Sequence, residues 1–227
     1  MIIVIQCAAT KSPGAGRMRS PGGKPVCFVA NPQGAPSDSS FDYARPDDAS
    51  DSGMSWRQGL EKYNRESGSN PWGLFPAYQL YKHKIYGKLV DRFGPKKVFI
   101  LSAGWGLIRS DYLVPCYDIT FSSQADPHKR RRRHDEFKDF CMLPQDTEEE
   151  IVYFGGQDYL ELFSKLTSRW TGHKTVFFNS KCPPILPGCT LERFETSAKT
   201  NWHYPCASDF LKRNGGAASA WIELTLA

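Results

Sequence analysis

The sequence predicts an α/β fold with a mostly parallel central sheet and helices on both faces. Short apolar runs rich in β-branched and aromatic residues recur at residues 1–6, 97–101, 150–154 and 175–178, with a weaker fifth run at 191–195. Such runs are typical of strands that are buried on both faces of a parallel sheet. Helical patterns lie between several of them, so we expect right-handed crossovers in a single three-layer domain over residues 1–227.

Composition and charge agree with one folded domain. The chain has 227 residues, of which 40% are hydrophobic and 23% charged, enough to enclose one hydrophobic core. No apolar run approaches the roughly 20 residues that span a bilayer, so we expect no membrane partner. The first residues lack the basic segment and cleavage site of a signal peptide, which favours a cytoplasmic location.

The seven cysteines do not form a recognisable framework. Their number is odd and no two have CxxC spacing, which argues against both a set of disulfides and a structural zinc site. We therefore expect reduced thiols, and neither a metal ion nor a cofactor.

Two long helices are predicted at residues 77–93 and 157–170, where apolar residues recur at spacings of three and four. A shorter helix capped by Ser55 is expected to reach Tyr63. A last helix is expected to begin near Ser208.

Residues 12–72 do not fit this alternation of strands and helices. The segment holds fifteen glycines and prolines in sixty-one positions, with seven basic and seven acidic residues. Segments of that length and composition inside a domain are usually functional lids or disordered. We expect an insertion that forms a lid over the carboxyl ends of the strands.

Loops that follow the strands are the candidate site segments, because ligands of parallel sheets bind beyond the carboxyl ends of the strands. Cys7 and Lys11 follow the first strand, where small neighbours allow close approach and the lysine offers a phosphate contact. Equally, they form a tight turn with a buried cysteine. Ser102 and Trp105 follow the second strand, and Trp105 would either stack on a base or fill the core.

Two aspartates after the second strand are candidates for the chemistry. Asp111 and Asp118, the latter beside Tyr117, would activate water or stabilise an oxocarbenium ion. The commoner use of loop aspartates is to cap turns.

The next two strand ends carry a double glycine and an asparagine. Gly155 and Gly156 precede a predicted helix, so their amides would bind an anion or a polar ligand edge, or merely form an economical turn. Asn179 offers both a donor and an acceptor to a base edge.

Basic residues form one continuous run. Five cations in succession favour phosphate contacts over a solvated helix turn, because each arginine can bind a phosphate through two hydrogen bonds. The residues of this run are Lys129, Arg130, Arg131, Arg132 and Arg133.

A segment near the carboxyl terminus interleaves basic and aromatic residues, as base-binding platforms do. Taken alone, its histidine is more often structural than catalytic. The candidates there are Lys199, Asn201, Trp202 and His203.

Taken together, these segments resemble the superfamily of the YaaA DNA-binding stress proteins and the small domains associated with archaeosine-type tRNA-guanine transglycosylases. The similarity covers residues 1 to about 170 in the family's order. Trp105 stands where the family usually has Tyr or Phe, and Ser110 where it has Pro. The matching pieces are the loop 7–11, Pro76-Ala77 with Leu80-Tyr81, residues 101–108, Asp111, Tyr117-Asp118 with Thr120, and Gly155-Gly156 through Tyr159.

The resemblance implies association with nucleic acid, since some relatives are thought to act as DNA glycosylases on modified bases, including those of phage DNA. We therefore expect a glycosylase that flips a modified base out of duplex DNA and leaves an abasic site, in anti-phage defence. Asp118 or Asp111 would be its carboxylate, and Lys11, Asn179 or His203 would assist the departing base. The alternatives are a nucleic-acid-binding protein without chemistry, and a hydrolase or transferase of free nucleosides or nucleotides.

Overall fold

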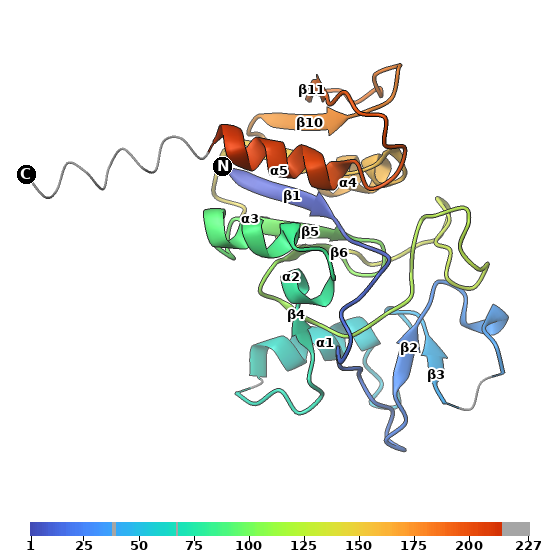
Figure 1. Ribbon diagram of the computed structural model, residues 1–227. Coiled ribbons are helices and arrows are strands. Elements are labelled where there is room, and N and C mark those ends of the chain that lie inside the picture. The colour runs from blue at the N-terminus through green and yellow to red at the C-terminus, as the bar shows by residue number, and fades with distance from the viewer. Residues whose placement is uncertain (38–39, 67, 215–227) are drawn as a thin grey trace, which may run out of the picture.

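A seven-stranded sheet runs through the computed structural model, which describes residues 1–37, 40–66 and 68–214 (Figure 1). Its strand order is β11-β10-β9-β1-β5-β6-β8. The first five strands in this order are mutually parallel, whereas β6 runs antiparallel to β5 and parallel to β8. Their bounds are β1 Ile2–Gln6, β5 Val98–Ser102, β6 Gly106–Arg109, β8 Phe140–Cys141, β9 Ile151–Phe154, β10 Lys174–Phe178 and β11 Thr190–Arg193.

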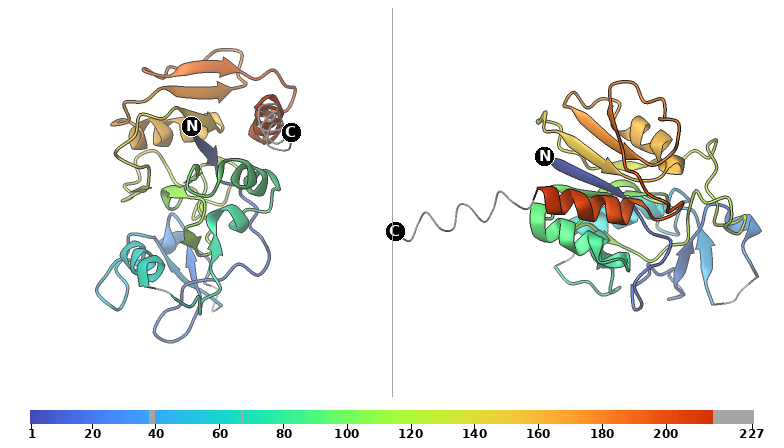
Figure 2. Two further views of the ribbon diagram at one scale, coloured as in Figure 1. Left: turned by 90° about the vertical axis from the view of Figure 1, so that its left-hand side faces the viewer. Right: turned by 45° about the horizontal axis from the view of Figure 1, so that its top comes forward.

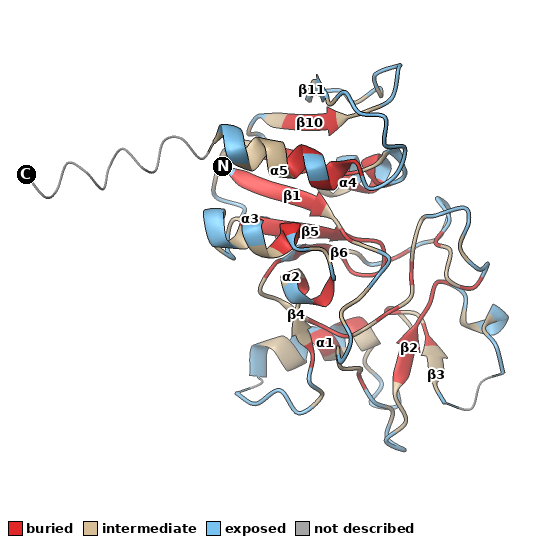
Figure 3. Ribbon diagram, in the orientation of Figure 1, coloured by how far each residue is buried: buried red, intermediate tan, exposed pale blue. Residues whose placement is uncertain are grey.

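Helices cover both faces of this sheet, so the predicted three-layer α/β fold is confirmed. α3 (Ile85–Phe93) and α5 (His203–Arg213) lie together on one face, and α4 (Leu160–Leu166) lies on the other (Figure 2). All five predicted strands of the sheet are present: β1, β5 and β9 are buried within it, whereas β11, the weaker fifth run, is a largely exposed edge strand. The side chains of residues 2–5 in β1 are fully buried at the centre of the sheet (Figure 3).

The long helix predicted over residues 77–93 is broken. α2 covers only Ala77–Leu80, Tyr81 is extended (φ −97°, ψ 128°), and α3 begins at Ile85. The amide of Lys82 donates to the carbonyl of Thr10 at 3.3 Å, so the chain at the break pairs with the loop after β1. Tyr81 fits the helical spacing of apolar residues, and the sequence pattern therefore could not reveal the break.

The other two predicted helices differ at their ends. A 3-10 turn, η2 (Gln157–Tyr159), precedes α4, which stops at Leu166 rather than at Trp170. α5 starts at His203, earlier than the predicted Ser208.

A tight turn at residues 103–105 connects β5 to β6, where the sequence suggested an open ligand loop. Gly106 has φ +87°, and a Cβ there would lie 2.4 Å from the carbonyl oxygen of Phe140, so only glycine fits. Because β6 returns antiparallel, the residues after Arg109 lie at the amino-terminal edge of the parallel strands.

Residues 12–72 fold into structure of their own. The helix predicted after Ser55 is present: its Oγ accepts the amide of Gln58 at 3.2 Å, and its own amide donates to Gln58 Oε1 at 2.9 Å, a reciprocal cap. β2 pairs in parallel with β3, while β4, just beyond the segment, pairs with β7. The bounds are β2 Val26–Phe28, η1 Pro32–Gly34, β3 Asp42–Ala44, α1 Trp56–Glu66, β4 Phe75–Pro76 and β7 Leu113–Val114.

This segment packs into the main core instead of resting over it. Met18, Phe28 and Leu60 are buried in the same hydrophobic cluster as the sheet, and the ring of Phe28 lies 5.1 Å from that of Trp105. These contacts are those of an integral part of the domain, in contrast to the expected lid.

Candidate functional site

Hydroxyl and thiol groups gather at the carboxyl ends of β1 and β5. The Tyr117 hydroxyl lies 2.8 Å from Ser102 Oγ and 2.9 Å from the Tyr81 hydroxyl. Cys7 Sγ lies 3.2 Å from the hydroxyl of Tyr159. All five side chains are buried, and we call them the strand-end cluster. Three of them, Cys7, Ser102 and Tyr117, were predicted to belong to the site.

Tyr81 and Tyr159 were not assigned a role from the sequence. Both stand in motifs that carry the family resemblance, and that position was the available signal. Burial raises the pKa of Tyr81, Tyr117 and Tyr159 well above the usual value. The three phenols therefore stay protonated at neutral pH and can share hydrogen bonds, but they cannot serve as general bases.

Lys11 covers this cluster. Its ammonium lies 4.3 Å from the centre of the Tyr117 ring and donates to the carbonyl of Ala9 at 3.1 Å. Desolvation lowers the pKa of Lys11, and attraction to Cys7 and Asp118 opposes this shift. Lys11, which was predicted to contact a phosphate, is thus a half-buried amine that packs against the face of the Tyr117 ring.

The two candidate aspartates lie at opposite edges of the sheet. Asp118 follows Tyr117, its amide donates to the carbonyl of Phe28 at 2.8 Å, and its carboxylate lies 3.1 Å from Lys129 Nζ with 45% of the side chain exposed. Asp111 follows the antiparallel strand β6 and pairs with Arg109 at 2.5 Å. The prediction that Asp111 belongs to the strand-end site is therefore wrong, because β6 runs antiparallel to β5 and places Asp111 at the opposite edge of the sheet.

A cavity of about 280 Å³ opens beyond β9, which pairs with β1, and β10, which pairs with the other side of β9. It brings together Gly155, Asn179 and Trp202, which were predicted separately, and we call it the strand-end pocket. Asn179 Nδ2 donates to the carbonyl of Ala198 at 3.2 Å. The Trp202 side chain is largely buried in its wall.

The structure explains both glycines after β9 without a bound ligand. A Cβ at Gly155 would lie 2.0 Å from the Tyr153 hydroxyl, so a larger residue would displace that ring. The amide of Gly156 donates to Gln6 Oε1 at 2.5 Å. This bond replaces the predicted anion contact of Gly156.

The residues around the start of α5 are divided between surface and core. Lys199 and Asn201 are exposed, and Asn201 has φ +57°. His203 is 1% exposed, its ring lies 4.1 Å from the Tyr204 ring, and its Nε2 has no hydrogen-bond partner among the residues that the structure describes. Burial lowers the pKa of His203 to about 3. It is therefore a neutral core side chain, and the prediction of a catalytic histidine is not supported by its surroundings.

Trp105 fills the core, so the prediction that it stacks on a base is wrong. Its indole is fully buried and packs against Phe28, Tyr117 and Phe140 at 5.1, 6.5 and 6.5 Å. The turn that carries it is closed by Ser102 Oγ, which accepts the Trp105 amide at 3.1 Å.

The basic run is an extended segment with turns, neither a helix nor five equivalent cations. Arg131 is buried and binds Asp139 through two hydrogen bonds of 2.8 and 2.6 Å, so it is not available to phosphate. Lys129 bridges Asp118 and Asp126 at 3.1 and 2.9 Å. Arg133 lies 3.4 Å from Glu161.

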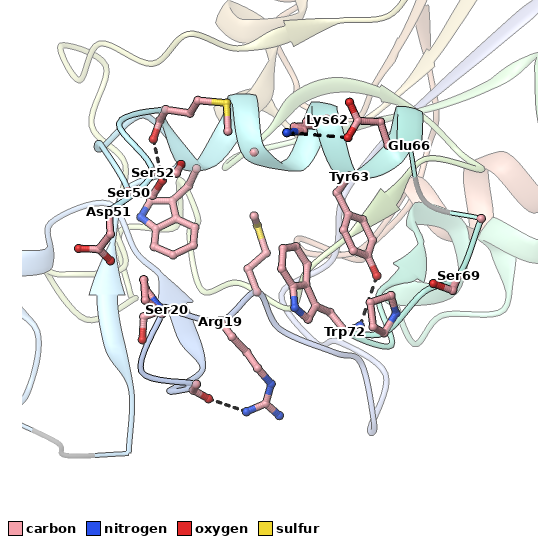
Figure 4. Close-up of a pocket in the computed structure, with 18 residues that line it drawn as sticks. Arg19, Ser20, Ser50, Asp51, Ser52, Lys62, Tyr63, Glu66, Ser69 and Trp72 are labelled. Atoms are coloured by element: carbon pink, nitrogen blue, oxygen red, sulfur yellow. Dashed lines mark hydrogen bonds and ion pairs between the residues drawn. The ribbon is translucent and has the colours of Figure 1, made fainter.

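A cavity of about 730 Å³ lies within residues 18–72 (Figure 4). Most of its wall surface is apolar: the Tyr63 and Trp72 rings stack 4.4 Å apart on one side, and Trp56 also lines it. Of the described residues that line it, none was predicted to belong to the site.

No family model, curated protein or solved structure matches the chain. Within residues 1–37, 40–66 and 68–214, no helix combines the length and the apolar character that crossing a membrane requires.

Proposed function

We propose that the protein is a DNA glycosylase that hydrolyses the N-glycosidic bond of a modified base, in anti-phage defence. The observation that carries the proposal is the strand-end pocket, which joins Asn179, Trp202 and Gly155 at the same sheet edge as Asp118 and Lys11. A base flipped from a duplex needs such a recess, with a polar group for its edge and an apolar wall.

Each group has a role in this proposal. Asn179 hydrogen-bonds the edge of the base, and Trp202 supports the wall of the recess. Asp118 stabilises positive charge on the sugar as the bond between C1′ and the base nitrogen breaks, and water adds to C1′. Lys11 hydrogen-bonds the departing base, whose negative charge a half-buried ammonium would stabilise.

The test compares the two aspartates. We expect Asp118→Asn to slow base release about 10²- to 10⁴-fold, because it removes the negative charge and nearly preserves the shape. Asp111→Asn is the matched control, since Asp111 lies at the far edge and should keep the wild-type rate. The measurement is single-turnover formation of alkali-labile sites in hypermodified phage DNA, with unmodified DNA alongside.

Equal rates for wild type and both variants would remove Asp118 from the chemistry. Absence of alkali-labile sites with every DNA would refute the glycosylase itself.

One observation favours a second candidate, a nucleic-acid-binding protein without chemistry. The carboxylate of Asp118 is held by Lys129, and the hydroxyls of the strand-end cluster bind one another. For that protein, DNA would bind with unchanged affinity to the Asp118→Asn variant and would be recovered intact.

A further inference from the structure

A polar pocket of about 400 Å³ lies between the 12–72 insertion and the basic run. Arg45 and Asn31 line it from the insertion, and Arg130 and Arg132 line it from the run. In Figures 1 and 2 the parallel pair β2 and β3 lies beside the yellow-green loop that carries the run. We call this cavity the arginine pocket.

The three guanidinium groups of the arginine pocket have no acidic partner within the part of the chain that the structure describes. Arg45 donates to the carbonyl of Glu136 at 2.5 Å and its guanidinium lies 4.6 Å from the centre of the Phe137 ring, while its buried Nε has no acceptor in the described ranges. Arg130 makes only a long bond of 3.4 Å to the carbonyl of Ser123. The side chain of Arg132 is exposed.

The two aspartates in the wall are engaged elsewhere. Asp48 accepts the amide of Arg45 at 2.7 Å, and Asp135 accepts the amide of Arg132 at 2.7 Å. Both carboxylates thus close turns of the backbone. Three guanidinium groups against two carboxylates leave one positive charge in excess, and among the described residues their only guanidinium hydrogen bonds are the two to the carbonyls of Glu136 and Ser123.

These donors fit a phosphate group. Guanidinium binds phosphate oxygens through paired parallel hydrogen bonds, which neutral polar ligands cannot match. The volume exceeds that of a phosphate alone and leaves room for the attached sugar. The side chains of Asn31 and Gln33, also in the wall, are amides suited to hydroxyl groups of that sugar.

We propose that Arg45, Arg130 and Arg132 hold a backbone phosphate of the nucleic acid. The pocket adjoins the proposed site, because Thr120 pairs with Arg130 while the neighbouring Lys129 binds Asp118. A phosphate bound there would fix the strand beside that carboxylate. The inference rests on the proposed function only in that the phosphate belongs to DNA.

The experiment measures the affinity of the full chain for an unmodified duplex by fluorescence anisotropy, from about 50 to 200 mM salt. Arg45→Ala, Arg130→Ala and Arg132→Ala should each weaken binding several-fold and reduce the slope of log affinity against log salt by about one. Arg133→Ala is the control from the same run: its guanidinium, next to Glu161, does not line the arginine pocket. Thermal unfolding of each variant checks that the fold is retained.

The proposal that the arginine pocket binds a phosphate would be overturned if the salt slope were unchanged in the three variants, or if Arg133→Ala reduced it equally. A second arm titrates inorganic phosphate: if the variants lose phosphate binding but keep duplex affinity, the site serves a small phosphate compound, which overturns the nucleic-acid assignment. Unmodified DNA releases no base, so failure of the glycosylase leaves this result intact. Conversely, normal duplex binding in all variants would reject the pocket while base release by wild type still supports the glycosylase.

Discussion

Two buried arginines hold three successive carbonyl groups of the turn after β5. Arg131 donates to Ala103 at 2.8 Å, and Arg57 donates to Gly104 at 3.0 Å and to Trp105 at 3.1 Å. Each guanidinium is also paired with a carboxylate, Arg131 with Asp139 and Arg57 with Asp47. The turn that bears Trp105 is therefore fixed by charge-assisted bonds from two distant parts of the chain.

Removal of Arg131 should be costly. Arg131→Ala leaves the Asp139 carboxylate, 1% exposed, without its cation, and such losses typically lower the free energy of unfolding by about 3 to 5 kcal/mol. Arg133→Ala should change it by less than about 0.5 kcal/mol, because that guanidinium is 80% exposed. Urea unfolding of both variants gives the comparison. Similar values for the two would mean that Arg131 acts as a surface charge.

His203 makes stability depend on pH. Its ordinary pKa is 6.5, and burial lowers the pKa in the folded protein to about 3. Between these values the unfolded chain binds a proton that the folded chain does not, so protonation favours unfolding. The contribution of neutral His203 is complete above pH 6.5 and declines as the pH falls toward 3.

The free energy of unfolding should therefore decrease by up to about 1.4 kcal/mol for each pH unit below 6.5. His203→Gln, which cannot be protonated in this range, should remove that part of the slope. Urea unfolding at pH 7, 6 and 5 measures both proteins. Parallel pH profiles would show that His203 is protonated in the folded state.

At the scale of elements, the five strands with apolar runs could be predicted from the sequence, whereas the ends and breaks of the helices could not. Continuous apolar runs have few alternatives to a buried strand, and β1, β5 and β9 appear where expected. The break after α2 depends on tertiary contacts, because the Tyr81 hydroxyl bonds that of Tyr117 and the amide of Lys82 donates to the carbonyl of Thr10. Apolar spacing is blind to such contacts.

The candidate site follows the same division. Lys11 lies at the expected edge because it follows β1 directly, whereas Asp118, predicted in the same loop as Asp111, comes after β6 and β7. The predicted position of Asp111 was wrong because no pattern in residues 103–109 indicates that β6 runs antiparallel to β5. The availability of each arginine depended on partners such as Asp139 and Glu161, which only the folded chain brings close.

The cap of α1 offers a test at this scale. Ser55→Ala removes the acceptor of the Gln58 amide and should cost about 1 kcal/mol of unfolding free energy. Ser55→Asp retains a capping oxygen and should stay close to wild type. Chemical denaturation distinguishes them, and equal losses in both variants would show that the cap contributes nothing.

At the scale of the whole molecule, residues 12–72 belong to the cooperative unit. Met18, Phe28 and Leu60 contribute to the core, and Arg57 binds the turn after β5. A lid could be removed without loss of the fold. Removal of residues 12–72, in contrast, would take away Phe28 and expose Trp105.

Replacing residues 12–72 by a short glycine-serine linker should therefore prevent cooperative folding. Near-ultraviolet circular dichroism and urea titration would report the loss of fixed packing. A cooperative transition in the shortened chain would restore the interpretation of the segment as a cover. Wild type at the same concentration serves as the reference.

The central place of β1 also determines when the domain can form during synthesis. β1 is synthesised before the other strands of its sheet, yet its two neighbours are β5, where Ile3 pairs with Val98, and β9, where Ile2 pairs with Ile151. Until β5 and β9 have been synthesised, the apolar segment of β1 has no partner on either edge, and unpaired apolar strands are prone to aggregate. Contacts this distant in sequence also slow folding. The domain is therefore expected to close its sheet only after most of the chain has been made, and to depend on chaperones in the interval.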